Sequence, residues 1–209
     1  MDKTRNTGIP AVMLAAGKSE RMGQWKMSLP WGKSTIIETS VKHALTACSR
    51  IILVSGWAHE ELSRLFDAPS WEEQREKIRI VKSANWETGM FASACCGFNA
   101  ASGDVAGLPP WCFLCLGDMP EVSPGTYLRA ASFMDSGCLA GSVIPQFKGK
   151  KGHPVLLSRE AVAYALSLSD TDSMRDVISA FPSLVIPACE IGVLNDIDTP
   201  EDYRKHYEK

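Results

Sequence analysis

The sequence predicts an α/β fold in which a mostly parallel sheet lies between two layers of helices. Two observations lead to this prediction. Short apolar runs alternate with segments of helical periodicity along the whole chain, which is the pattern of strands joined by crossover helices. Runs such as 12–15 and 51–54 are apolar without alternation, as expected for strands that are buried on both faces. We therefore expect a three-layer α/β/α, Rossmann-like arrangement with the first strand near the centre of the sheet.

The elements follow one another without a linker or an internal repeat. Segment 9–15 is predicted to be the first strand, and a helix at 34–45 is predicted to begin at a Ser34 or Thr35 cap. Further strands are predicted at 50–56, 78–83, 111–118, 138–145, 153–158 and 183–188. Further helices are predicted at 59–66, 90–101, 123–134, 159–168, 173–181 and 200–208. We expect a single domain over 1–209 in which residues 1–8 are flexible.

Composition excludes several classes of protein. The chain has 209 residues, a formal net charge of −2 and no strongly basic segment, whereas nucleic-acid binding normally requires a basic surface. No apolar run approaches the ~20 residues of a membrane helix, and the polar N-terminus lacks the apolar centre of a secretory signal. We expect a cytoplasmic protein that binds neither nucleic acid nor membrane.

The seven cysteines do not predict a metal or redox site. Cys112 and Cys115 have the C-x-x-C spacing of such sites. They lie within a predicted strand, however, where residues three apart face opposite sides. We expect ordinary buried thiols in a reducing compartment.

The tripeptide Gly-Lys-Ser, which ends a phosphate-binding P-loop, occurs twice, at 17–19 and 32–34. A P-loop needs another glycine five positions before the tripeptide, because its backbone N–H groups wrap the phosphates. Val12 and Met27 occupy those positions. The sequence therefore excludes a P-loop at either place.

The loop after the first strand nevertheless has the composition of a polyphosphate site. Residues 15–17 are Ala-Ala-Gly, which let a ligand approach backbone N–H groups closely, and Arg21 and Lys26 add two cations on the same segment. Ligands of open α/β sheets bind at the carboxyl ends of strands. The dinucleotide fingerprint G-x-G-x-x-G is absent, so a dinucleotide site of that type is not expected. A basic surface loop is the alternative interpretation of this segment.

Carboxylates occur at two later places. Asp118 ends the strand at 111–118, which puts it at the same sheet edge as the loop, where a carboxylate beside phosphates commonly holds Mg²⁺. Asp196 and Asp198 precede the last predicted helix. An N-terminal cap explains residues 199–202 but does not explain these two aspartates.

Together these segments resemble the MobA-like nucleotidyltransferases. Residues 13–38, MLAAGKSERMGQWKMSLPWGKSTIIE, are similar to the family signature L-A-A-G-x-S-x-R-M-G-x-x-K-x-L-L-P-x-x-G. The later motifs GDMP, GHPVLLSR and DIDTPEDY follow at suitable distances, so the match runs from Val12 to Tyr203. The Leu-Ala-Ala-Gly form resembles the molybdenum cofactor cytidylyltransferase branch, which uses CTP.

The resemblance implies a nucleotide-diphospho-sugar-transferase-like fold and a Mg²⁺-dependent transfer of CMP from CTP to molybdopterin, with release of pyrophosphate. It implies the following site residues. Catalytic residues would be Arg21, Lys26 and Asp118. Nucleotide-binding residues would be Leu14, Ala15, Ala16, Gly17, Arg21, Lys26, Gly89, Met90 and Ser93. Metal ligands would be Asp118 and Asp198, and acceptor-binding residues His153 and Arg175.

Several alternatives stay open at this point. The family segment Gly-Asp-x-Gly-x-Arg reads SDTDSMR at 169–175, so Arg175 is kept while both glycines are lost. GTP could replace CTP, another phosphorylated compound could replace molybdopterin, or the chain could be a non-catalytic nucleotide-binding accessory protein of cofactor maturation. A target molybdoenzyme or its chaperone is the expected protein partner.

Overall fold

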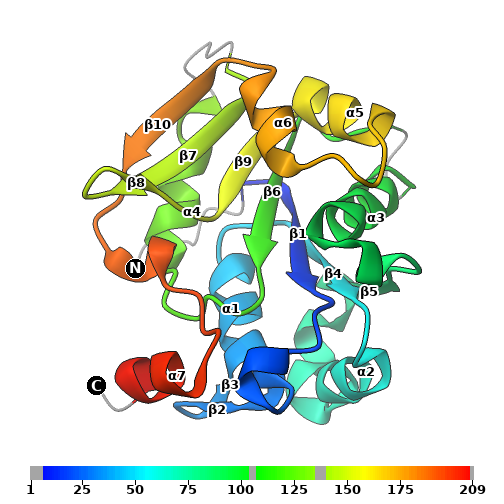
Figure 1. Ribbon diagram of the computed structural model, residues 1–209, viewed down its shortest axis with the longest axis vertical. Helices are drawn as coiled ribbons and strands as arrows, with labels where there is room; N and C mark the ends of the chain where they lie inside the picture. Colours follow the sequence, from blue (N-terminus) through cyan, green and yellow to red (C-terminus); the bar gives the residue numbers. More distant parts are fainter. Residues whose placement is uncertain (1–6, 104–106, 135–139, 208–209) are drawn as a thin grey trace.

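One mixed sheet runs through the molecule in the computed structural model, which describes residues 7–103, 107–134 and 140–207. The strand order is β10-β7-β9-β6-β1-β4-β5, and β8 pairs with β7 (Figure 1). The bounds of these strands are β1 Pro10–Ala15, β4 Arg50–Ser55, β5 Ile78–Lys82, β6 Trp111–Leu116, β7 Ser142–Phe147, β8 Lys150–Lys151, β9 Val155–Ser158 and β10 Ser183–Pro187. Residues 1–6 of the segment predicted to be flexible, 1–8, lie outside the described residues.

Helices cover both faces of this sheet. The α-helices are α1 Ile36–Leu45, α2 His59–Asp67, α3 Met90–Gly103, α4 Pro124–Ala131, α5 Arg159–Ser167, α6 Met174–Ser179 and α7 Pro200–Tyr207. The described 3-10 helices are η1 Glu20–Met22, η2 Lys26–Ser28, η3 Pro69–Lys77, η4 Trp86–Thr88 and η6 Ile191–Leu194. The charge-rich 3-10 helix η3 has a buried Trp71 and otherwise faces solvent.

Alternate residues of β1 explain why the layers form on both sides. Met13 packs in a core with residues of α1, α2 and α4, whereas Val12 packs in a second core with residues of α3, α5 and α6. All six residues of β1 are buried, and β1 pairs in parallel with β4 and β6. The predicted three-layer α/β/α fold with a mostly parallel sheet is confirmed. Cys112 and Cys115 are buried in the two different cores.

Strand β9 departs from the parallel arrangement. A two-residue turn at Lys148 and Gly149, both with positive φ, sends the chain back along β7 as a tight hairpin. The chain then enters β9, which is antiparallel to both β6 and β7. The apolar run at 153–158 predicts a buried strand but carries no signal of its direction. The carboxyl ends of β1, β6 and β7 therefore still meet at one edge of the sheet.

The entry to α1 also differs from the sequence prediction. The predicted helix at 34–45 begins at Ile36, because Ser34 and Thr35 form β3, which pairs with β2 (Pro30–Trp31). Gly32 and Lys33 of the second Gly-Lys-Ser thus form the turn of a small hairpin, with Gly32 at positive φ. Thr35 is the helix cap: its hydroxyl accepts from the Glu38 N–H at 3.3 Å, and the Glu38 carboxylate accepts from the Thr35 N–H at 2.9 Å.

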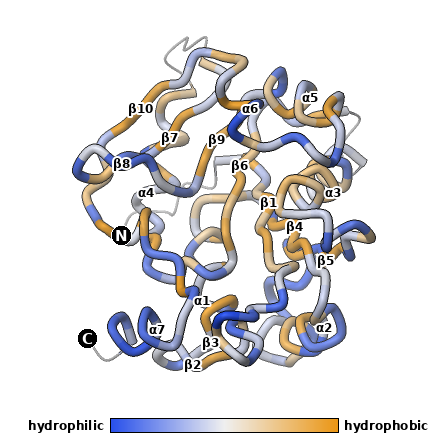
Figure 2. The backbone as a smooth tube through the Cα atoms, in the orientation of Figure 1, coloured by the Kyte–Doolittle hydropathy of each residue, from blue (hydrophilic) through white to orange (hydrophobic). Residues whose placement is uncertain are grey.

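Hydrophobic residues concentrate in the central strands, and α7 and the β8 hairpin are mostly hydrophilic (Figure 2). Within the described part of the chain, each helix is too short or too polar to cross a bilayer.

Helix α3 packs against β1 and β4 through a glycine. A Cβ atom at Gly97 would lie 2.3 Å from Val12 Cγ1 and 2.8 Å from Val54 Cγ2. We predict that Gly97→Ala lowers the free energy of unfolding by about 2 kcal/mol, because overpacking outweighs the helix propensity gained. Gly103→Ala, at the end of the same helix and with no described atom within 4 Å, should leave it unchanged within about 0.5 kcal/mol. Urea denaturation measures both, and equal stability of the two variants would contradict this packing role.

Candidate active site

A pocket of about 620 Å³ opens at the carboxyl ends of β1 and β6. Three stretches of the chain form most of its wall: the loop after β1, the start of α3 and the acidic residues near the C-terminus. The lining residues are Leu14, Ala15, Ala16, Gly17, Lys18, Ser19, Glu20, Arg21, Lys26, Met27, Trp86, Glu87, Gly89, Met90, Ser93, Leu116, Asp118, Asp196 and Asp198. All residues expected to bind nucleotide or metal therefore line one pocket.

Backbone contacts hold the loop after β1 in place. The Ala16 carbonyl accepts from the Trp57 N–H at 3.1 Å. Ser19 takes up a left-handed conformation at φ 60°, and its hydroxyl accepts from the Lys26 N–H at 3.2 Å. Trp25 and Met27 are buried on either side of Lys26, so the lysine leaves the backbone at a fixed place.

Gly117 explains how Asp118 reaches the same pocket. A Cβ atom at this position would lie 2.6 Å from Ile37 Cδ1 and 3.0 Å from the Leu14 carbonyl oxygen. The Gly117 N–H donates to that carbonyl at 2.9 Å. A larger residue would push the chain away from β1, so glycine lets Asp118 stand directly beside the loop.

The last part of the chain, residues 195–207, which we call the C-terminal arm, supplies the remaining carboxylates. The Ile197 N–H donates to the Asp118 carbonyl at 3.0 Å, which sets the arm beside the end of β6. Asp198 follows at once, and Thr199 begins α7 through reciprocal hydrogen bonds with Asp202. The arm therefore turns into its helix immediately after presenting Asp198 to the pocket.

A buried lysine joins the two predicted metal ligands. Lys26 Nζ lies 2.5 Å from Asp118 Oδ2 and 2.6 Å from Asp198 Oδ1. Arg21 Nη2 lies 2.5 Å from Asp198 Oδ2. The Lys26 side chain is 10% exposed, whereas that of Arg21 is 70% exposed. One cation thus already contacts both carboxylates, although eighty residues separate them in the chain.

These contacts change the protonation equilibria of the cluster. Burial lowers the pKa of Lys26, but the charges and hydrogen bonds of Asp118 and Asp198 outweigh it, so the pKa lies above its ordinary value. Burial raises the pKa of Asp198, but Lys26 and Arg21 outweigh this effect and the pKa is lowered. Desolvation, with the charges of Asp198 and Asp118, raises the pKa of Asp196. The cluster holds Lys26 and Asp198 in their charged forms.

The donor set fits a divalent cation that also takes ligands from elsewhere. Asp118 Oδ1 is buried and has no hydrogen-bond partner among the described residues, so one carboxylate oxygen is free for a further contact. The described residues contain no group of three or more His, Cys, Asp or Glu side chains placed to hold a metal. Mg²⁺ commonly takes one or two carboxylates and completes its shell with phosphate oxygens and water.

The far end of the pocket lies at the start of α3. Gly89 has φ 144°, a conformation that favours glycine, and Ser93 is buried one turn later, whereas Met90 is 61% exposed. Sequence reasoning missed Trp86 in this region. Its ring lies against Gly56, where a Cβ atom would be 2.6 Å from Trp86 Cγ, and Lys18 Nζ lies 5.2 Å from the ring centroid.

The two predicted acceptor residues lie outside the pocket lining. His153 precedes β9, beside the end of β6; its Nδ1 is buried without a partner among the described residues. Burial lowers the pKa of His153, although a hydrogen bond to the Leu114 backbone and the charge of Asp118 oppose the change. Arg175 is exposed on α6. The structure thus brings His153 close to Asp118 and leaves Arg175 apart.

Fold and pocket are those of an α/β protein whose ligand site lies at the carboxyl edge of its sheet. The model of the MobA-like NTP transferase domain matches residues 11–184. The chain belongs to this family, and it is a nucleotidyltransferase.

Its relatives cover nearly the whole chain. It is 32% identical over 197 residues to the molybdenum cofactor cytidylyltransferase of Escherichia coli (strain K12), with 94% of each protein covered. It is 28% identical over 206 residues to the purine catabolism protein PucB of Bacillus subtilis (strain 168), with 95% of this chain and 96% of that protein covered.

Among solved structures, Rv0371c from Mycobacterium tuberculosis H37Rv has a TM-score of 0.72 and 25% identity, with 96% of this chain and 98% of that chain covered. A structure of Rv0371c in complex with manganese has a TM-score of 0.69 and 23% identity over the same shares of the two chains.

Removing the ammonium should destabilise the fold, because Asp118 and Asp198 would face each other with only the exposed Arg21, which contacts Asp198 alone, to offset their charges. We predict that Lys26→Met lowers the free energy of unfolding by about 3 kcal/mol in metal-free buffer at pH 7. The folded-state pKa of Asp198 is lowered, so its stabilising effect is present above its unfolded pKa and is lost as pH falls through the folded one. The difference from the native protein should therefore shrink in acid.

The exposed Lys33 provides the control, since Lys33→Met removes the same charge from the β2–β3 hairpin. Urea titrations of the three proteins at several pH values test this prediction. A Lys26→Met variant as stable as the Lys33→Met variant at pH 7 would disprove the bridging role of Lys26.

Proposed function

We propose that this nucleotidyltransferase transfers CMP from CTP to a molybdopterin acceptor and releases pyrophosphate. The observation that carries the proposal is the meeting of Lys26, Arg21, Asp118 and Asp198 in one pocket with the loop after β1. The similarity to the Escherichia coli molybdenum cofactor cytidylyltransferase over nearly the full length supports the choice of substrates.

The triphosphate would lie over residues 15–17 and the base near the start of α3. Small side chains at Ala15, Ala16 and Gly17 leave backbone N–H groups accessible to phosphate oxygens. Gly89 and the buried Ser93 lie at the far end of the same pocket, where their polar groups can contact the edge of a base. Leu14 and Met90 complete the expected nucleotide contacts.

Asp118 and Asp198 would hold a divalent metal, which we take to be Mg²⁺. The free buried oxygen of Asp118 supports this assignment, as does the manganese complex of the related Rv0371c. When bound, the metal supplies positive charge that offsets the charge of the phosphate oxygens. Asp118 and Asp198 would orient it at the edge of the pocket where the loop after β1 begins.

In the reaction, a phosphate oxygen of the acceptor attacks the α-phosphorus of CTP. The new P–O bond forms as the bond from the α-phosphorus to the bridging oxygen of the β-phosphate breaks, and pyrophosphate leaves with the electron pair. The acceptor phosphate is an anion at neutral pH, so no protein base needs to remove a proton. Lys26 and Arg21 stabilise the charge that builds on pyrophosphate, and the pocket walls align the two reactants.

The acceptor would enter from the side of β9. His153, beside the end of β6 and with an unpartnered Nδ1, is our candidate for an acceptor contact. Arg175 on α6 stays a prediction, because its exposed position neither favours nor opposes contact with an anionic acceptor. The product would pass to a molybdoenzyme or to its chaperone.

Pyrophosphate release from each of the four NTPs, with and without molybdopterin, tests the proposed function. We expect release with CTP and molybdopterin together, and a kcat/KM for CTP at least tenfold above that for GTP. Equal values for the two nucleotides would contradict the choice of base, and release that does not depend on molybdopterin would contradict the choice of acceptor.

Ala16→Gly sharpens the test of base choice. Ala16 lines the pocket on the way from the triphosphate over residues 15–17 to the base at the start of α3, so its methyl group would narrow the space for a purine nucleotide more than for a pyrimidine nucleotide. The variant should therefore use GTP better relative to CTP, by about tenfold for a contact of about 1.4 kcal/mol. The matched control is Ala15→Gly, in which the ratio of kcat/KM for GTP to that for CTP should stay near the native value.

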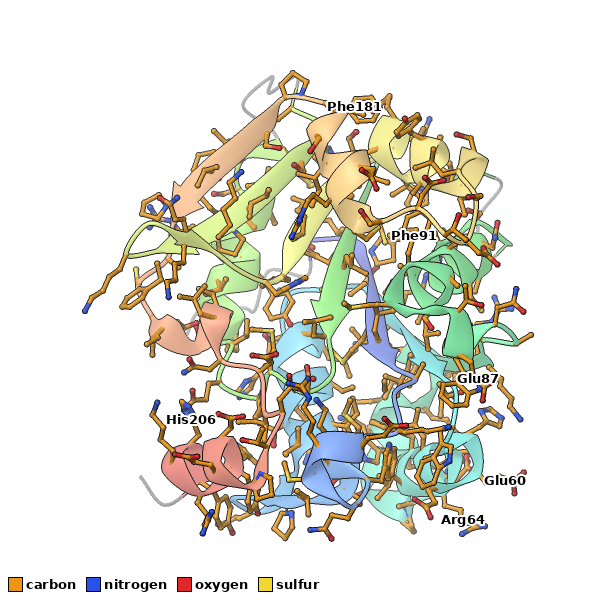
Figure 3. All side chains as sticks on the ribbon, in the orientation of Figure 1. Glu60, Arg64, Glu87, Phe91, Phe181 and His206 are labelled. Atoms are coloured by element: carbon orange, nitrogen blue, oxygen red, sulfur yellow. The ribbon has the colours of Figure 1, made fainter. Side chains whose placement is uncertain are left out.

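Arg21→Ala should lower kcat while leaving the KM for CTP within about threefold, since the charge on the leaving group is largest in the transition state. The barrier should rise by about 2–4 kcal/mol, the range for one preorganised donor. Arg64→Ala is the control, because Arg64 lies on α2 away from the pocket (Figure 3). An unchanged kcat in Arg21→Ala would refute the assigned role.

A further inference from the structure

Apolar contacts fix the C-terminal arm to one side of the pocket. Ile197 is fully buried in a small core with Met22 of η1 and Ile36 of α1. Tyr203 packs on Trp31 of the β2–β3 hairpin with ring centroids 6.3 Å apart. In Figure 1, α7 accordingly lies beside β2 and β3 at the lower edge of the molecule. These apolar contacts join the arm to the loop after β1 and to α1, whereas the hydrogen bond from the Ile197 N–H to the Asp118 carbonyl joins it to the loop after β6.

Glu121 contacts the arm from the other side, three residues after Asp118. Its Oε2 accepts from Asn195 Nδ2 at 2.6 Å. The same oxygen lies 3.0 Å from His206 Nδ1, a close approach without the geometry of a hydrogen bond. His206 stands on the side of α7 that faces the rest of the molecule (Figure 3). One carboxylate therefore contacts the arm both before and after Asp198.

The separation of Asp118 and Asp198 matters because like charges repel. Without a cation between them, the two carboxylates would move apart, and Asp196 adds a further negative charge nearby. A metal with bonds of about 2.1 Å tolerates little displacement of its ligands. A side chain that keeps the arm against the loop after β6 would therefore raise metal affinity without touching the metal.

We propose that Glu121 is a positioning residue that keeps Asp198 within reach of a cation held by Asp118, by bridging the loop after β6 to Asn195 and His206. This inference rests on the metal site of the proposed function. Glu121 does not line the pocket, so its effect is exerted through the arm.

This role depends on the length of the Glu121 side chain rather than on its charge. Glu121→Asp keeps the negative charge but shortens the side chain by one methylene, so the carboxylate no longer reaches Asn195. Glu121→Gln removes the charge but keeps an oxygen at the same distance, which can still accept from the Asn195 amide. A long-range effect of charge on the metal would give the opposite order, with Glu121→Asp close to native.

The test is the affinity of the metal-free protein for Mn²⁺, measured by electron paramagnetic resonance, in the presence of a non-hydrolysable CTP analogue. We expect Glu121→Asp to raise the Kd for Mn²⁺ about tenfold and Glu121→Gln to stay within about threefold of native. Amide exchange at Ile197, whose N–H donates to the Asp118 carbonyl, supplies a readout without metal, and it should be faster only in Glu121→Asp.

Glu190→Asp is the matched control. Glu190 also links a C-terminal segment to residues after β6, since its Oε1 accepts from the Ser123 N–H and the Thr126 hydroxyl at 2.8 Å each. Glu190 comes before residue 195, where the arm begins. Glu190→Asp should therefore lower the free energy of unfolding without changing the Kd for Mn²⁺.

Native affinity and exchange in Glu121→Asp would overturn the positioning role, as would an equal loss of affinity in Glu190→Asp. Failure of the native protein to bind Mn²⁺ would instead overturn the metal site of the proposed function, and with it this inference.

Discussion

The contact of one buried ammonium with two carboxylates is the constraint on which the rest of the site depends. Lys26 comes from the loop after β1, Asp118 from the end of β6 and Asp198 from the C-terminal arm. Burying any of these charges alone would be strongly unfavourable, whereas together each satisfies the others. The folded chain is therefore most stable when the three segments bring their charged ends to one place.

The sheet brings Lys26 and Asp118 together without any unusual backbone arrangement of the strands. Strands β1 and β6 are parallel neighbours, so both end at the same edge and their loops begin within a few ångströms of each other. Gly117 removes the one side chain that would separate them. The arm has no strand to guide it. It is held by the Ile197 core and the aromatic contacts of α7, together with the hydrogen bonds from Ile197 to Asp118 and from Asn195 to Glu121. The same charges that stabilise this junction are those assigned to phosphate and metal in the proposed reaction.

The sequence predicted the layered α/β fold because buried strands and amphipathic helices have strong local patterns. Runs such as 12–15 are apolar on both faces, and the motif at 13–38 is long enough to identify the family. The direction and register of the strands could not be predicted from the sequence in the same way. Nothing local distinguishes an antiparallel β9 from a parallel strand, and the two-residue β3 is hidden in what looks like the first turn of a helix.

The sequence by itself determined which residue types the site would contain, since glycines, two cations and the aspartates stand beside predicted strand ends. Only the tertiary structure decided how they pair. Lys26 lies between Asp118 and Asp198 because of contacts between segments far apart in the chain. Trp86 enters the pocket wall because Gly56 leaves room for its ring, and Glu121 contacts Asn195 and His206, which lie 74 and 85 residues later in the chain. Such long-range contacts leave no periodic or spacing signal, because they arise from packing between elements rather than within them.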